Sequence, residues 1–150
     1  MKKKLKPKNF ILDVDGVLTT GQFLYDENGK KFKIFGPDDS DALNILKKYI
    51  NIVFVSADKR GFKISKKRVK DDMGYPIYLV QSLKRVDWID KKFNLKQTIY
   101  MGDGFYDHLV MKKSFYSIST SDSDINAKKF AKYITKREGG KRAVAEASMH

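Results

Sequence analysis

Residues 9–19 read NFILDVDGVLT, a run of apolar side chains that stops at two aspartates and a glycine. A short, continuous apolar run such as Phe10 to Leu12 is typical of a strand buried on both faces of a parallel sheet. Side chains alternate along a strand, so Asp13 and Asp15 point the same way. Gly16 has no side chain and lets the backbone approach a ligand. The segment therefore predicts a buried strand with an acidic site at its carboxyl end.

The rest of the chain alternates between strand and helix patterns. We expect further strands at residues 50–55, 76–80, 98–101, 115–119 and 133–134, and helices from residue 41 and at about 64–73, 84–93, 106–113 and 124–132. This alternation predicts an α/β fold, a Rossmann-like doubly wound parallel sheet with helices on both faces and ligands beyond the carboxyl ends of its strands. Asn28-Gly29 between two short apolar runs predicts a β-hairpin at about residues 22–35, inserted after the first strand.

Length and composition limit the class of protein. A chain of 150 residues with 41% hydrophobic content can form one core, so we expect a basic N-terminal tail over residues 1–8 and a single domain over 9–150. The absence of cysteine excludes thiol catalysis and thiolate zinc sites. No apolar run is long enough to span a bilayer and no secretory signal pattern is present, so the expected location is cytoplasmic, with no membrane partner.

The formal net charge of +13 comes partly from five lysines in residues 1–8. The basic residues are 26 lysines and 5 arginines, whereas bidentate recognition of phosphate or guanine favours arginine. We therefore attribute the charge mainly to solvated lysines and the tail. A nucleic-acid-binding protein or a polynucleotide-end phosphatase is the weakest of the functional hypotheses.

Aspartates separated by one residue occur three times in this chain, so spacing alone is weak evidence for a site. The pair Asp13 and Asp15 differs from the others because it ends a buried strand. Asp103 follows the strand at 98–101 and Asp107 lies four residues later, so both reach the same sheet edge if the two strands are neighbours. Four carboxylates there would repel one another unless a divalent cation that prefers oxygen ligands lay among them. The sequence thus predicts a Mg²⁺ site.

Four segments together resemble the motifs of the haloacid dehalogenase (HAD) superfamily of aspartate-nucleophile phosphatases. In chain order they are Asp13 to Thr19, Ser56, Lys84 and Gly102 to Asp107. The early hairpin, the lack of a cap domain and the segment Gly139 to Val144 narrow the match. They make the chain similar to the capless 3-deoxy-D-manno-octulosonate 8-phosphate phosphatase group and to the related domain that follows acylneuraminate cytidylyltransferases. The resemblance covers Phe10 to about Glu146.

The resemblance implies catalytic roles for the first aspartates. Asp13 would attack phosphorus to form an aspartyl-phosphate, and Asp15 would act as acid and then as base. Mg²⁺ would be held by Asp13, the carbonyl of Asp15 and Asp103, while Asp107 would anchor metal-bound water or the loop. The implied reaction is Mg²⁺-dependent hydrolysis of a small sugar phosphomonoester of the 3-deoxy-ulosonate or nonulosonate phosphate type.

Ser56 and Lys84 would bind the phosphoryl oxygens on the same resemblance. Each of the weaker motif residues has a plainer alternative. Ser56 could cap the helix after its strand, Lys84 could be one more solvated lysine, and Asp107 could be a first-turn acid favoured by the helix dipole.

Three departures from the family pattern bear on the substrate rather than on the chemistry. Asp38-Asp39-Ser40 stands where the family typically has Arg-Asp-Gly, Ala57-Asp58 where it has Gly-Arg, and Ala145 where it has an arginine. Lys59 or Arg60, directly after Asp58, is a possible substitute for the second of these arginines. Each departure removes a positive charge suited to a sugar carboxylate. They also motivate an alternative function, a non-catalytic oligomerisation module of HAD fold associated with a nucleotidyltransferase.

The predicted hairpin carries more apolar surface than a lone two-stranded ribbon can bury. Its apolar residues are Phe23, Tyr25, Phe32, Ile34 and Phe35. The resembled family forms tetramers through this hairpin. We therefore expect a homotetramer whose active sites are walled partly by a neighbouring subunit.

Overall fold

The computed structural model describes residues 6–150, so residues 1–5 of the predicted basic tail lie outside the described residues. One sheet of six strands has the order β5-β4-β1-β6-β7-β8, and all its pairs are parallel. The strands are β1 (Asn9–Asp13), β4 (Asn51–Ser56), β5 (Ile77–Leu79), β6 (Thr98–Met101), β7 (Tyr116–Ser119) and β8 (Tyr133–Ile134). The predicted α/β fold is confirmed, with no cap domain among the residues described.

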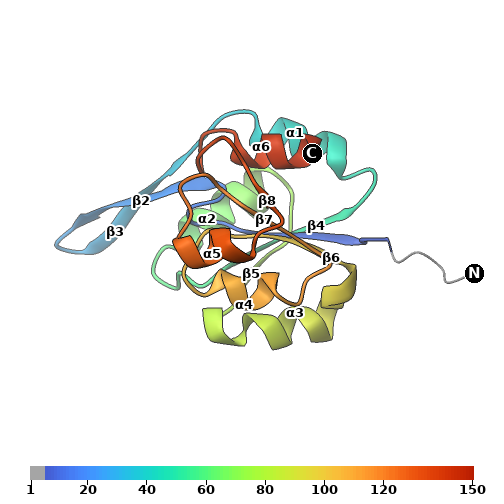
Figure 1. The fold of residues 1–150 in the computed structure, drawn as a ribbon. Helices are drawn as coiled ribbons and strands as arrows, with labels where there is room; N and C mark the ends of the chain where they lie inside the picture. The colour runs from blue at the N-terminus through green and yellow to red at the C-terminus, as the bar shows by residue number, and fades with distance from the viewer. Residues whose placement is uncertain (1–5) are drawn as a thin grey trace, which may run out of the picture.

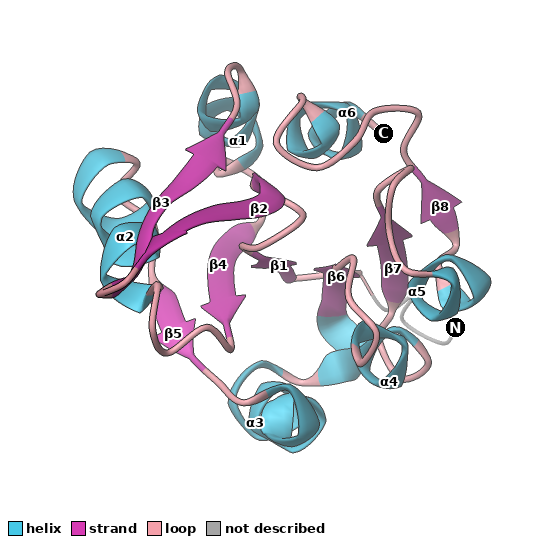
Figure 2. Ribbon diagram, turned by 90° about the vertical axis from the view of Figure 1, so that its left-hand side faces the viewer, coloured by secondary structure: helices cyan, strands magenta, loops and turns pink. Residues whose placement is uncertain are grey.

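Helices cover both faces of the sheet, as Figure 2 shows in an end-on view. They are α1 (Asp39–Leu46), α2 (Phe62–Lys66) continued by the π-helical turn η1 (Lys67–Asp72), the short turn η2 (Ser82–Lys84) leading into α3 (Arg85–Phe93), the turn η3 (Leu95–Gln97), α4 (Asp107–Met111), α5 (Ile125–Phe130) and α6 (Ala143–Met149). Alternation along β1 divides the core, because Phe10 and Leu12 pack under α1, η1 and α6 while Ile11 packs over α3, α4 and α5. None of the helices within residues 6–150 is both long and apolar enough to cross a membrane.

The predicted hairpin consists of β2 (Thr19–Asp26) and β3 (Gly29–Phe35), an antiparallel pair that projects beyond the sheet (Figure 1). It begins three residues earlier than expected. Phe23, Tyr25, Phe32 and Ile34 are 43–63% exposed, as predicted. Phe35 differs, because it packs against the core at the base of the hairpin.

Helix α6 was not expected from the sequence, and it packs beside α1 (Figure 1). The backbone N–H of Ala145, in the first turn of α6, donates to Asp39 Oδ1 at 2.9 Å. The first N–H groups of a helix have no partner inside it, so a carboxylate from α1 caps α6. Asp39 is 1% exposed and its Oδ2 has no partner within the described residues. Burial raises the pKa of Asp39 to about 6, against the hydrogen bond from Ala145, which lowers it.

This buried carboxyl predicts a pH-dependent stability difference. A pKa raised on folding means that the folded state holds the proton more tightly, so the stability due to this group is lost as pH rises from about 4 to about 6. Asp39→Asn should therefore match the wild type near pH 4 and be more stable by about 1–2 kcal/mol at pH 8. Urea unfolding at both pH values measures the difference. Exposed Asp41, in the same helical turn, provides the control. A gain at pH 8 from Asp41→Asn as large as that from Asp39→Asn would contradict the explanation.

Candidate active site

The sheet register brings the predicted motifs together. Strand β1 lies between β4 and β6, with Asp13 opposite Val55 and Leu12 opposite Met101. The residues that follow each strand therefore emerge at one edge of the sheet. The neighbouring strands assumed from the sequence are confirmed.

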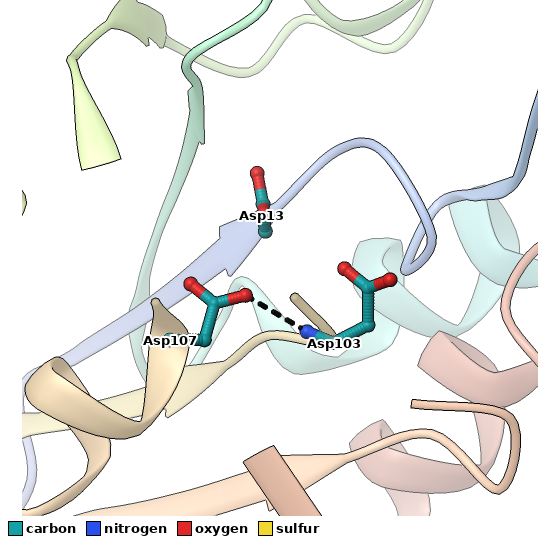
Figure 3. Close-up of side chains that lie close together, drawn as sticks. All are labelled: Asp13, Asp103 and Asp107. Carbon is teal, nitrogen blue, oxygen red and sulfur yellow. Dashed lines mark hydrogen bonds between the residues drawn. The ribbon is translucent and has the colours of Figure 1, made fainter. Parts of the chain in front are cut away.

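Three carboxylates meet at this edge, on the end of β1, the loop after β6 and the start of α4 (Figure 3). One oxygen each of Asp13, Asp103 and Asp107 lies within 4.8 Å of the others. Burial, reinforced by repulsion from Asp13, raises the pKa of Asp103 to about 9. Burial also raises the pKa of Asp13 to about 7, although the charge of Arg85 opposes it. Crowded oxygen donors that ionise reluctantly suit a divalent cation, whose charge would favour their ionised forms.

Asp107 is fully occupied by hydrogen bonds within the chain. Its Oδ1 accepts from the Tyr100 hydroxyl and the Arg85 guanidinium, and its Oδ2 accepts from the backbone N–H groups of Asp103 and Gly104 at 2.9 and 2.8 Å. Asp107 therefore holds the loop that presents Asp103.

Gly16 allows the first turn to approach Asp103. Its φ is 81°, in the left-handed region, and a Cβ at this position would lie 1.9 Å from Asp103 Oδ2. The segment Gly139-Gly140 packs on this turn from the other side, where the N–H of Gly140 donates to the Val17 carbonyl at 3.1 Å and a Cβ on Gly139 would meet the Gly16 carbonyl at 1.9 Å. A side chain on Gly16 would collide with Asp103, and one on Gly139 would collide with the backbone of the turn after β1.

Asp15 faces different partners from those of Asp13. Its Oδ2 accepts from the Ser56 hydroxyl at 3.1 Å, and its Oδ1 lies 2.7 Å from Nζ of Lys33, a buried residue of the hairpin. The helix-cap alternative for Ser56 is wrong, because α2 begins only at Phe62 and Ser56 accepts instead from the N–H of Asp58.

Lys33 also reaches Asp58, at 2.8 Å, and Lys30 reaches the same carboxylate at 2.5 Å. Burial would raise the pKa of Asp58, but the hydrogen bonds from the two lysines outweigh it and lower the pKa to about 2. Asp58 is therefore ionised throughout the physiological range. The sequence analysis missed both lysines because nothing in their local spacing shows which strand end they reach.

Lys84 is not brought to the carboxylates. It is exposed on η2, whereas the next residue, Arg85, is 2% exposed. Nη1 of Arg85 lies 3.2 Å from Asp13 Oδ2 and 3.1 Å from Asp107 Oδ1, and its Nε has no hydrogen-bond partner in the part of the chain described. The sequence could have predicted that Arg85 is buried, because it lies four residues before the core residue Ile89 and on the same face of the helix.

A pocket of about 290 Å³ opens over this edge and joins both halves of the site. Its lining residues are Asp13, Asp15, Phe23, Lys30, Ala57, Asp58, Ser82 and Arg85. A second pocket of about 340 Å³ lies near Phe10 and Ile99, among mainly apolar residues and without a carboxylate. A third pocket, of about 470 Å³, is lined by Tyr133, Lys136, Arg137, Ala145, Glu146 and Met149. Of the three, the first is the one where cations converge with a candidate nucleophile and a candidate proton donor, an arrangement suited to phosphate chemistry.

No protein-family model matches the chain. It is 30% identical over 155 residues to the 3-deoxy-D-manno-octulosonate 8-phosphate phosphatase KdsC of Haemophilus influenzae, covering 99% of this chain and 84% of that protein. The KdsC of Escherichia coli K12 is 30% identical over 141 residues, covering 91% of this chain and 74% of its own.

Solved structures agree with these relatives. The cobalt-bound phosphatase of Haemophilus influenzae superposes with a TM-score of 0.81 at 30% identity, covering 97% of this chain and 88% of its own. The Moraxella catarrhalis phosphatase, in complex with magnesium, phosphate and KDO, superposes with a TM-score of 0.82 at 27% identity, covering 95% and 83%. At 30% identity over nearly the whole chain, and with the same fold, the chain belongs to the haloacid dehalogenase superfamily and, within it, to the KdsC-like phosphatase group, and it is a phosphatase.

Proposed function

We propose that this protein is a Mg²⁺-dependent phosphomonoesterase that hydrolyses a small sugar phosphate through an aspartyl-phosphate on Asp13. The observation that carries the proposal is the position of Asp13. It ends β1 beside Asp103, contacts Arg85 and lines the pocket together with Asp15. A nucleophile, a proton donor and a cation for the phosphoryl group thus face one open volume.

The reaction would proceed in two displacements. An oxygen of Asp13 attacks phosphorus while the bond to the leaving oxygen breaks, and Asp15 gives its proton to that oxygen. Asp15, now a carboxylate, then takes a proton from water as the water oxygen attacks the phosphoryl group, which releases orthophosphate and restores Asp13. Ser56 and Lys33 contact the two oxygens of the Asp15 carboxyl and fix its position beside the pocket.

Asp13, Asp103 and the carbonyl of Asp15 are the proposed Mg²⁺ ligands. The cation would supply positive charge that lets an anionic nucleophile approach a phosphate dianion. The magnesium and cobalt named with the two solved relatives support the proposal of a divalent ion. Asp107 remains a supporting residue, because its oxygens are already occupied.

Arg85 takes the phosphate-binding role that the resemblance assigned to Lys84. Its guanidinium is buried beside the nucleophile and lines the pocket, and its Nε has no hydrogen-bond partner among the described residues. Ser56 is proposed to share in binding the phosphoryl oxygens once substrate enters. The relatives' named substrate makes ulosonate and nonulosonate phosphates the reference class for assay, and accepting that class requires a cation free to meet its carboxylate.

Removal of the metal or of the nucleophile should abolish phosphate release. We expect Mg²⁺ to support turnover of p-nitrophenyl phosphate and a panel of sugar phosphates, a chelator to stop it, and Asp13→Asn to lower kcat by about 10³-fold or more. Phosphate release measures each effect, and readdition of Mg²⁺ is the control for the chelator. Undiminished turnover by Asp13→Asn would overturn the mechanism. A folded oligomer without any turnover would favour the non-catalytic module instead.

Lys84 and Arg85 are adjacent in the chain, so their roles in binding phosphate can be compared by matched substitutions. Arg85→Met should lower kcat/KM by about 10²-fold, because it removes a buried donor beside the phosphoryl group, while Lys84→Met should change it less than about threefold. Steady-state kinetics with p-nitrophenyl phosphate separate the two variants. A larger loss from Lys84→Met than from Arg85→Met would restore the lysine to the role implied by the resemblance.

The exposed hairpin predicts a homotetramer. Its aromatic side chains Phe23, Tyr25 and Phe32 are half exposed or more, and the burial of such a surface favours association. Light scattering should give about four times the 17.3 kDa chain mass. Replacing all three residues by serine should release monomers, whereas the exposed Tyr49→Ser, away from the hairpin, should not. A wild-type monomer, or a tetramer that survives the triple replacement, would refute the assembly.

A further inference from the structure

One carboxylate holds both lysines that the hairpin brings to the pocket. Asp58 Oδ2 lies 2.5 Å from Nζ of Lys30 and 2.8 Å from Nζ of Lys33. The side chains of these lysines are only 7% and 1% exposed. Asp58 is itself fixed, because its Oδ1 accepts from the N–H of Gly61 at 3.0 Å. The three charges therefore form a rigid group in the wall of the active-site pocket.

Among the described residues that line the pocket or contact its carboxylates, every cation is already paired, so none of them is left to meet a second acid on the substrate. The carboxylates of the site are Asp13, Asp15, Asp58, Asp103 and Asp107, and its cations are Lys30, Lys33 and Arg85. Each of these cations already contacts at least one of these carboxylates. Ionised together, the side chains have an excess of two negative charges, which one divalent cation would balance. A bound phosphate dianion then makes the site negative again, so another carboxylate would enter against repulsion.

We infer that Asp58 makes this pocket selective for phosphomonoesters of uncharged sugars or sugar alcohols over those that carry a carboxylate, because Asp58 occupies the two lysines that a substrate carboxylate would need. The inference rests on the proposed phosphatase function and narrows its substrate class. Hydroxyl groups of a sugar can donate to Asp58, as a carboxylate cannot. Phe23, which lines the same pocket under Lys30 Nζ at 3.9 Å from its ring centroid, offers an apolar face to the sugar carbons.

A matched pair of substrates tests this selectivity. Glucitol 6-phosphate and 6-phosphogluconate differ only at C1, which is a hydroxymethyl group in one and a carboxylate in the other. We expect the wild type to prefer glucitol 6-phosphate by about tenfold or more in kcat/KM, and Asp58→Asn to reduce that preference by about tenfold, because Lys30 is released from its acidic partner and Lys33 keeps only its contact with Asp15. Asp26→Asn is the control. It breaks an exposed pair with Lys31 elsewhere on the hairpin and should leave the ratio within about twofold.

Binding provides a second readout that does not need turnover. In Asp13→Asn, with and without Asp58→Asn, calorimetric dissociation constants for the two phosphate esters should show the same preference and the same reduction. Asp58→Ser replaces Asp58→Asn if the latter fails to fold, as judged by circular dichroism. Equal efficiency of the wild type on the two esters, or a ratio unchanged in a folded Asp58 variant, would overturn the inference. If neither ester nor p-nitrophenyl phosphate is hydrolysed, the proposed function fails, and the dissociation constants alone decide the selectivity.

Discussion

Mutual repulsion among buried carboxylates at the carboxyl ends of β1 and β6 is the constraint on which the site depends. Asp13 and Asp103 are held within a few ångströms of each other, and burial above all, with repulsion from neighbouring carboxylates added to it, raises the pKa of both. The surrounding residues serve to maintain this arrangement. Arg85 offsets part of the charge, the hydrogen bonds of Asp107 fix the loop, and Gly16 leaves room for the Asp103 carboxylate. The fold thus gathers carboxylates whose ionised forms a bound divalent cation would stabilise.

The hairpin combines two properties that would ordinarily belong to a separate cap. Its second strand, β3, sends Lys33 to Asp15 and Lys30 to Asp58, while the hairpin also presents exposed aromatic side chains. Any association through those side chains would therefore act on the strand that orients the proposed proton donor. The hairpin thus connects the proposed subunit interface to the charged residues of the pocket.

The C-terminal segment of the chain packs against the turn that follows the first strand. Gly139-Gly140 packs on the turn that follows β1, and α6 is capped by the Asp39 carboxylate of α1. Glu146 of α6 accepts hydrogen bonds from the Tyr133 hydroxyl and from the N–H groups of Lys136 and Arg137, which ties the helix to the segment after β8. The C-terminal segment of this chain is thus integrated with its own first turn, and the geometry of Asp15 and Gly16 depends on that contact.

Local chemistry in the sequence was enough to predict the strand and helix alternation, the hairpin at Asn28-Gly29 and the carboxylate edge with Asp13, Asp15 and Asp103. These features follow from periodicity, turn preference and the position of acids after buried strands, all of which act over a few residues. Adjacent residues on a helix point about 100° apart, so the packing of Ile89 in the core decided that Arg85 and not Lys84 faces the nucleophile. The pairing of Lys30 and Lys33 with Asp58 joins residues 25 or more apart in the chain, and the capping of α6 by Asp39 joins residues more than a hundred apart. Only the tertiary structure could decide these contacts, because which distant charges meet depends on how the elements pack and not on the sequence near each charge.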